Sequence, residues 1–381
     1  MKKFLAISAS AVMALSVFAF SACTDNTDKG AENLTYTEVD LSTEEAKAEF
    51  LEELTTNINP EKLFGDTKAE GFSYGLASDV KLSAEVNATA KAVPVSETET
   101  KDLSAYVKVE LGESLQYKFS EKDVLLSSKT NVKYNTNIAD EIYALVALYL
   151  EMPEGSVETL KTVFASGDYT LNEYIDGEYL YVEYPESIVG LLPEEIQGFL
   201  PEGGKLKIAF SDLAGFGSGD NNDSYYSSTE DAYDEGMETV NMIEYIFNII
   251  ETCNVKIAVS KENGYALKVS ADKDSIVKLI KQTPAAAYWA QVEQVATFNT
   301  CALTAYLAVD ENGLFKEVTV KAELNATVNM VADLIMEGIP AINGSVKLSL
   351  EASVKSYDGT VNLPSDLDSF KKVEFPEGNE E

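Results

Sequence analysis

LASDVKLSAEVNATA, residues 76–90, alternates between apolar and polar side chains over its whole length. One parity is apolar or small and comprises Leu76, Ser78, Val80, Leu82, Ala84, Val86, Ala88 and Ala90. The other parity is polar and comprises Asp79, Lys81, Ser83, Glu85, Asn87 and Thr89. Because successive side chains of a strand point to opposite faces, this pattern predicts a long strand of an antiparallel sheet with one dry and one wet face.

Other segments repeat this alternation, at 103–111, 115–119, 317–330 and 346–354. Dipeptides that accept positive φ lie between pairs of alternating runs, at Asp176-Gly177, Asn263-Gly264 and Asn312-Gly313. Such dipeptides are the strongest short-range signal for a β-hairpin. The sequence therefore predicts three hairpins within a sheet of many strands.

Three strand segments, 80–90, 318–328 and 346–355, resemble one another weakly. An internal duplication would explain the similarity. Three like strands of one sheet explain it more simply, because the expected helices do not repeat in step with the strands.

Helical patterns interrupt the strands. Residues 42–45 form a capping-box sequence, and the apolar spacing that follows predicts an amphipathic helix ending before Pro60. Further helices are expected at 138–151, 187–200, 229–252 and 272–282. The polar segment 215–235 either divides two domains or is an insertion in one sheet, and we favour the insertion.

The fold class expected from these patterns is α+β, built on a large curved antiparallel sheet of half-barrel-like shape. Strands of about 15 residues or more exceed the usual length, and sheets of long strands twist strongly. We expect the helices at 138–151 and 187–200 to cover the concave apolar face. Small residues there either let the helices pack closely or leave a cavity for a hydrophobic ligand. The candidate ligand-binding residues are Ala84, Val86, Ala88, Leu145, Leu148, Leu191, Leu192, Ala322, Leu324 and Ala326.

The amino-acid composition excludes several classes of partner and of catalytic site. The 381 residues include 29 basic and 64 acidic side chains, for a net charge of −35. Such a charge repels nucleic acid, so no nucleic-acid partner is expected. The sequence contains no histidine and no arginine. This excludes Ser-His-Asp triads, imidazole metal ligands and bidentate arginine clamps, whereas carboxylate, lysine, tyrosine and serine chemistry stays open.

The first residues have the features of an export signal. Two lysines precede an uncharged apolar run at 4–20, and two small residues then lead into Cys23. This arrangement resembles the lipobox of bacterial lipoprotein signal peptides, with Phe20 where leucine is usual. The resemblance implies that the Cys23 thiol receives diacylglycerol and that residues 1–22 are removed. An ordinary cleaved signal and a retained anchor helix are the alternatives.

A lipid on Cys23 would place the protein outside the cytoplasm, anchored to a bacterial cell membrane. Residues 23–41 are polar and acidic and are expected to form a flexible tether. Residues 42–381 are expected to form a single domain, with a possible insertion or break near 215–235. Apart from Cys23, the cysteines are Cys253 and Cys301, each at the start of an expected strand, which either pair as a disulfide or stay as free thiols.

The mature chain resembles the LolA-type and LppX-type lipoproteins in its opening helix, long alternating strands, apolar inserted helices and Asp-Gly or Asn-Gly hairpins. The resemblance covers residues 42–375 and carries no diagnostic motif. Those families fold as an open half-barrel around helices and carry acyl chains or lipidated cargo. The arginine associated with the LolA carriers is absent here. The resemblance implies a lipid- or hydrophobe-binding surface lipoprotein.

We therefore expect a non-catalytic protein that binds a lipid or other hydrophobic ligand and uses no cofactor or metal. One alternative is a structural or adhesive protein that binds another macromolecule. The other alternative is a carboxylate-based hydrolase. The loop acids Asp220, Asp223, Asp231 and Glu235 say little in its favour, because a solvated acidic loop explains them better.

Overall fold

The structure is a computed structural model, and it describes residues 30–59, 62–65, 69, 71–96, 98–120, 123–149, 152–153, 155–190, 197–198, 200–211, 252–282, 286–330 and 341–373. The strands are β1 (Thr37–Glu38), β2 (Ser73–Pro94), β3 (Thr100–Ser120), β4 (Val124–Ile138), β5 (Gly167–Asp176), β6 (Tyr179–Glu183), β7 (Lys205–Ala209), β8 (Lys256–Ser260), β9 (Tyr265–Ala271), β10 (Ala296–Val309), β11 (Phe315–Met330), β12 (Ile342–Ser356) and β13 (Lys371–Lys372). The helices are η1 (Ala31–Asn33), α2 (Glu44–Asn57), α3 (Asp140–Tyr149), α4 (Ser156–Val163), α5 (Glu186–Val189), α9 (Lys273–Lys281), α10 (Ala286–Val295) and η5 (Leu367–Ser369).

All thirteen strands belong to one open sheet, in the order β1-β8-β9-β10-β11-β12-β2-β3-β4-β5-β6-β7-β13. Neighbouring strands pair antiparallel except β7 and β13, which are parallel, so the sheet is mixed. The two edge strands are two residues long, which leaves little free edge for pairing with another chain. The sheet is not closed into a barrel.

The sheet joins two parts of the sequence. Strands β2 to β7 follow one another along one half, and β8 to β12 follow one another along the other half. The halves meet where β12 pairs with β2, from Ile342 opposite Ala90 to Ser356 opposite Leu76. The expected domain break or insertion near 215–235 lies outside the described residues, but the strands before and after it belong to the same sheet.

The three expected hairpins are confirmed. Gly177, Gly264 and Gly313 have φ of 63°, 121° and 78° and connect β5 to β6, β8 to β9 and β10 to β11. The opening helix is also confirmed as α2. Its N-cap residue is Thr43, whose side chain accepts a hydrogen bond from the backbone N–H of Ala46.

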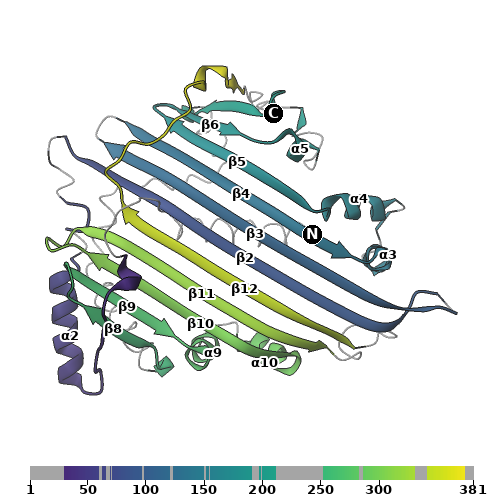
Figure 1. Ribbon diagram of the computed structural model, residues 1–381, viewed down its shortest axis with the longest axis horizontal. Helices are drawn as coiled ribbons and strands as arrows, with labels where there is room; N and C mark the ends of the chain where they lie inside the picture. Colours follow the sequence, from purple (N-terminus) through teal and green to yellow (C-terminus); the bar gives the residue numbers. More distant parts are fainter. Residues whose placement is uncertain are drawn as a thin grey trace, which may run out of the picture.

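The described helices do not form the expected layer over one face. Figure 1 shows α3, α4, α9 and α10 at the ends of the long strands and α2 beside β8 and β9. Length explains the difference. Helix α3 has 10 residues and rises about 15 Å, whereas β4, with 15 residues, spans about 50 Å. A helix of that length cannot cover the strand that precedes it. The expected helix at 229–252 lies outside the described residues, except for its last residue.

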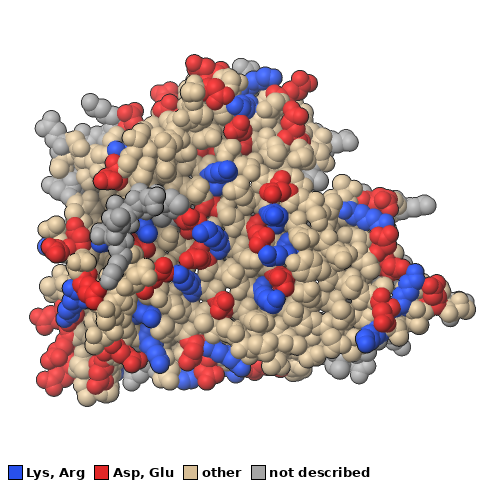
Figure 2. All heavy atoms as spheres, in the orientation of Figure 1, with Lys and Arg blue, Asp and Glu red and all other residues tan. Residues whose placement is uncertain are grey.

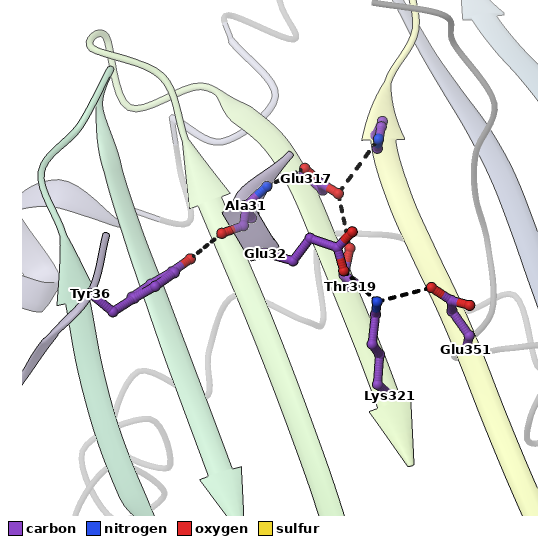
Figure 3. A network of polar contacts seen from close by, with 8 residues as sticks. Ala31, Glu32, Tyr36, Glu317, Thr319, Lys321 and Glu351 are labelled. Carbon is purple, nitrogen blue, oxygen red and sulfur yellow. Dashed lines mark hydrogen bonds and ion pairs between the residues drawn. The ribbon is translucent and has the colours of Figure 1, made fainter. Parts of the chain in front are cut away.

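Residues 30–38 correct the expectation of a flexible tether that extends to Leu41. Ala31 is buried, and β1 pairs with β8 at the edge of the sheet. Figure 3 shows why this segment docks: the N–H of Ala31 donates to the buried carboxylate of Glu317 over 2.8 Å, and Lys321 contacts Glu32. The hydroxyl of Tyr36 donates to the carbonyl of Ala31 over 2.7 Å. An unpaired carboxylate buried there would be costly, so these contacts hold the segment in place.

The C-terminal segment is docked on the same side of the sheet. After β12 it crosses the ends of β2 to β5 toward β13 (Figure 1). Its Phe370 ring packs edge-on against Tyr181, with the ring centroids 5.5 Å apart, and Lys205 binds Asp366 over 2.7 Å. Both ends of the described chain are therefore fastened to the sheet by side-chain contacts that are distant in sequence.

Two glycines within long strands give a matched test of this packing. A Cβ atom at Gly344 of β12 would lie 2.3 Å from the carbonyl oxygen of Asn87, whereas one at Gly112 of β3 would meet nothing within 4 Å. We expect Gly344→Ala to lower the free energy of unfolding by about 1 to 3 kcal/mol, because backbone would have to shift. Gly112→Ala should leave it unchanged or slightly higher. Urea denaturation measures both, and equal effects of the two substitutions would contradict the described β12–β2 register.

Candidate functional site

Strand register divides the side chains of the central sheet into two faces. Leu324, Leu348, Ala84, Val109 and Tyr134 lie in one row across β11, β12, β2, β3 and β4. Rows on either side of this one continue the same side of the sheet. We call this side, over the strand residues in register with 78–86 of β2, the apolar face. Its members on the six longest strands are Phe298, Cys301, Leu303, Ala305 and Leu307 of β10, Val318, Val320, Ala322, Leu324 and Ala326 of β11, Val346, Leu348, Leu350, Ala352 and Val354 of β12, Ser78, Val80, Leu82, Ala84 and Val86 of β2, Val107, Val109, Leu111, Glu113 and Leu115 of β3, and Ser128, Thr130, Val132, Tyr134 and Thr136 of β4.

The structure brings the sequence-predicted strand residues onto this face. Ala84, Val86, Ala322, Leu324 and Ala326 all belong to it, and Ala88 lies one row beyond, opposite Gly344. The remaining predicted residues cannot be placed beside them. Leu191 and Leu192, together with the lipidation residue Cys23, lie outside the described residues. The same holds for the side chains of Leu145 and Leu148 on α3.

The apolar face is partly open to solvent. Val86 is 42% exposed, Leu348 39%, Leu303 37% and Tyr134 38%, although all four lie in the middle of long strands. Contiguous exposed apolar surface in a folded protein marks a site that binds a ligand, a partner or a membrane. The described part of the chain therefore exposes apolar side chains in the middle of this face, as a surface that binds a hydrophobic ligand would.

The single tryptophan lies at the border of the apolar face. Trp289 of α10 stacks on Phe298 of β10, with the ring centroids 4.9 Å apart and the rings inclined by 20°. Phe298 shares a row with Ala326, Val346 and Val86. A ligand bound at this border of the apolar face would therefore change the surroundings of Trp289, which gives the protein an intrinsic fluorescent reporter for that part of the face.

The two described cysteines are free thiols. Cys253 is buried just before β8, and Cys301 is half-buried on β10. Strand β9 lies between β8 and β10, so these strands are not neighbours as the disulfide alternative required. Two strand spacings amount to about 9.5 Å, whereas disulfide-bonded Cα atoms lie within about 7 Å.

Two carboxylates interrupt the apolar face. Glu113 of β3 occupies the inward position between Leu111 and Leu115, and Glu173 lies opposite Ser128 on the β5 continuation of the same face. The other Asp, Glu and Lys side chains on the described parts of β2 to β5 in register with this face project to the opposite side. The sequence carries a signal for Glu113, a carboxylate at inward parity, but the alternation of apolar residues alone does not single it out.

Both carboxyls have raised pKa values. Burial raises the pKa of Glu113 above its ordinary value of 4.5, and the nearby charge of Glu173 raises it further, whereas Ser128 lowers it. Burial likewise raises the pKa of Glu173. Each carboxyl is half-buried beside apolar neighbours, so its charged form loses hydration without gaining a cationic partner among the described residues of this face.

The opposite, polar face carries its charges in compensated rows. Lys321, Glu351 and Lys81 lie opposite one another on β11, β12 and β2, and Lys347, Glu85 and Lys108 form a second such row. Nζ of Lys321 lies 3.0 Å from Glu351, and Nζ of Lys347 lies 2.9 Å from Glu85. Figure 2 shows lysines and acids interleaved over the middle of this face.

A hollow of about 650 Å³ lies over these rows. The polar-face residues that line it are Lys81, Ser83, Glu110, Gly112, Ala302, Thr304, Lys321, Glu323, Ser349 and Glu351, together with parts of Leu82, Leu111, Ala322 and Leu350. Glu323 and Glu110 lie in one row, three strand spacings or about 14 Å apart. Catalytic carboxyls of glycosidases lie about 5 to 9.5 Å apart, so this pair does not have that geometry.

Neither a metal cluster nor a membrane span emerges from the described residues. They contain no group of three or more Cys, Asp or Glu side chains placed to hold a metal ion. None of the helices described is both long and apolar enough to cross a bilayer. The loop acids Asp220, Asp223, Asp231 and Glu235 lie outside the described residues.

No protein-family model matches the chain, and no curated protein matches it significantly.

Glu113 and Glu173, which we call the acid pair, lead to a prediction about stability. A raised pKa means that the folded protein holds the proton more tightly than the unfolded chain does. Each carboxyl therefore stabilises the fold fully below about pH 4.5, and this contribution is lost as pH rises through the raised pKa. At pH 7, Glu113→Gln and Glu173→Gln should each raise the free energy of unfolding, on the order of 0.5 kcal/mol after allowance for solvent screening.

Glu110→Gln is the matched control, because Glu110 lies on the polar face of the same strand and binds Lys108 over 2.6 Å. Its pKa is lowered by that lysine, so its loss should leave stability unchanged or slightly lower at pH 7. Urea denaturation at pH 5 and pH 7 measures the three variants. A loss of stability at pH 7 in both acid-pair variants would show that the two carboxylates have partners that stabilise their charged forms.

Proposed function

We propose that the protein is a membrane-anchored extracytoplasmic lipoprotein that binds a lipid or other hydrophobic ligand on the apolar face of its sheet. The observation that carries this proposal is the exposure of Val86, Leu348, Leu303 and Tyr134 in the middle of long strands. Removing such side chains from water stabilises a complex by about 25 cal/mol for each Å² of apolar surface buried.

The shape and chemistry of the face favour an alkyl chain as the ligand. Ala84, Ala322 and Ala326 are small, whereas Val86 and Leu348 beside them are larger and exposed, so the surface is uneven rather than flat. A row of uncharged side chains, without hydrogen-bonding groups from β11 to β3, offers little to a polar macromolecule. These features are typical of sites that recognise hydrocarbon by burial and fix its polar end elsewhere.

The anchor is the second part of the proposal. The lipobox-like sequence that ends at Cys23 supports covalent lipidation, and two or three acyl chains hold a protein on a membrane far better than one. The half-barrel-like curvature and the likeness to LolA-type and LppX-type lipoproteins belong to this proposal, which the long open antiparallel strands support. The role is non-catalytic and requires no cofactor.

Binding can be tested with two substitutions at adjacent positions of β12. Leu348 lies on the apolar face, and Ser349 lies on the polar face. The neutral fluorophore Nile red should bind the anchor-free protein and alter Trp289 emission. Leu348→Asn should weaken this binding about tenfold, because it removes apolar contact and adds a polar group, whereas Ser349→Asn should not. Absence of Nile red binding, or equal weakening by both substitutions, would refute a binding site on the apolar face.

Anchoring can be tested separately by changing the cysteine. In a bacterial host that processes lipoproteins, Cys23→Ser should move the protein from the membrane fraction to the soluble extracytoplasmic fraction, because the thiol that accepts the lipid is lost. Intact mass measurement of the purified wild-type protein should show the diacylglycerol adduct on Cys23. Cys301→Ser, the control, should leave the fractionation unchanged. An unmodified Cys23 in the membrane fraction would instead support the retained-helix alternative.

A further inference from the structure

We infer that Glu113, Glu173 and Ser128 form a headgroup site on the apolar face, which takes the protonated amine of an amphiphile whose alkyl chain lies along the apolar rows. This inference rests on the proposed function, since it assumes that the apolar face binds a hydrophobic chain. It adds the chemical class of the ligand and the residues that select it.

Register places the three side chains around one point on β4. Glu113 lies opposite Thr130 of β4, and Glu173 lies opposite Ser128, one row away. The two carboxylates thus approach β4 from its two neighbouring strands, in diagonal positions. Each is close enough to the other for the charge of Glu173 to act on Glu113.

The hydroxyl of Ser128 is the second observation that indicates a ligand. Ser128 is only 3% exposed, and its Oγ makes no hydrogen bond of standard geometry. It nevertheless lies near enough to Glu113 to lower the pKa of that carboxyl. A buried hydroxyl without a hydrogen-bond partner costs free energy, and such groups commonly mark a place that a ligand or an ordered water completes.

The described residues give the site no positive charge. Along the stretches of β2, β3, β4 and β12 that form the apolar face, every lysine side chain projects to the opposite, polar face. Among the described residues, the other titratable groups on this side near the acid pair are phenols, which supply no cation: Tyr117 on β3, Tyr169 on β5 and Tyr184 after β6. The two carboxylates therefore repel each other in a poorly hydrated place, and a bound cation removes that repulsion.

An alkylammonium fits this group better than a metal ion does. Calcium takes six to eight oxygen ligands, and the described residues hold no cluster of three acidic or thiol side chains. An ammonium has three donors, which match two carboxylates and one hydroxyl. Val109, Leu111 and Val132 lie in the rows beside the site and would contact the carbon chain. A fatty acid anion is disfavoured, because it would add a third negative charge.

The experiment compares two ligands with the same twelve-carbon chain, dodecylamine and the neutral monododecyl glycerol, below their micelle concentrations at pH 7 and about 150 mM salt. Isothermal titration calorimetry on the anchor-free protein measures binding. We expect dodecylamine to bind about tenfold more tightly than the neutral ligand, because its charge-assisted hydrogen bonds form in a desolvated place. Glu113→Gln and Glu173→Gln should abolish this preference and leave affinity for the neutral ligand unchanged.

Glu110→Gln controls for the general attraction of an amine to an acidic protein, since Glu110 faces away from the site on the same strand. This variant should keep the preference. Lowering the pH should reduce the preference before an ordinary glutamate titrates, because the pKa of both carboxyls is raised. Equal affinities for the two ligands, or equal effects of Glu110→Gln and Glu113→Gln, would overturn the headgroup site but leave the proposed function standing. Failure of both ligands to bind would overturn the proposed function itself.

Discussion

The pairing of β12 with β2 is the constraint on which the rest of the structure depends. It joins strands more than 250 residues apart in the sequence and fixes the register from Ile342–Ala90 to Ser356–Leu76. A slip of one residue would exchange the two faces of one half relative to the other. Lys81 and Glu351 would then meet apolar neighbours, and Ala84 and Leu348 would meet charges. The alternating patterns of all the long strands therefore favour the same register. Gly344, which has no Cβ, allows the close approach to Asn87 that this register requires.

The sequence predicts the local part of this architecture well. Alternation identifies the faces of β2, β3, β11 and β12, and positive-φ dipeptides identify the three hairpins, because both signals depend on neighbours in the chain. Strand order is a different matter. The consecutive described strands β7 and β8 lie toward opposite edges of the sheet, and no local pattern encodes that separation. The three similar strands 80–90, 318–328 and 346–355 are adjacent in one sheet, in the order β11-β12-β2, which both explanations of their similarity allow.

In the candidate site too, local sequence patterns predict some features, whereas others depend on strand pairing. Periodicity was enough to place Ala84, Val86, Ala322, Leu324 and Ala326 on one face, since parity alone decides it. Periodicity could not show that Glu113 and Glu173 lie diagonally across β4, because this depends on which strands pair and in what register. Nor could it show that Glu317 is buried under Ala31, since a carboxylate in a strand of wet-face parity is normally solvated. In both cases the informative residue is a carboxylate at a position where burial destabilises its charged form. The two cases differ in the partners that the carboxylate has. Glu317 accepts a hydrogen bond from the N-terminal segment and lies near Lys355, whereas the acid pair has no cationic partner among the described residues of its face.

The docked N-terminal segment also limits how the sheet of an anchored protein would be oriented relative to the membrane. Residues 23–29 are all that separate Cys23 from the docked segment, and seven residues span at most about 25 Å. A tether that ran freely to Leu41 would reach more than twice as far. The segment docks on the polar face beside β10 and β11 (Figure 3), so a lipid on Cys23 would hold that side of the sheet near the bilayer surface. The strands are longer than the tether, since β2 alone, with 22 residues, spans about 70 Å. With the polar face so held, the apolar face would be directed away from the membrane, and a ligand bound there would be separated from the bilayer by the sheet itself. Under the proposed function, such an arrangement would suit a protein that holds a hydrophobic molecule arriving from outside the anchoring membrane better than one that draws lipid from beneath its own anchor.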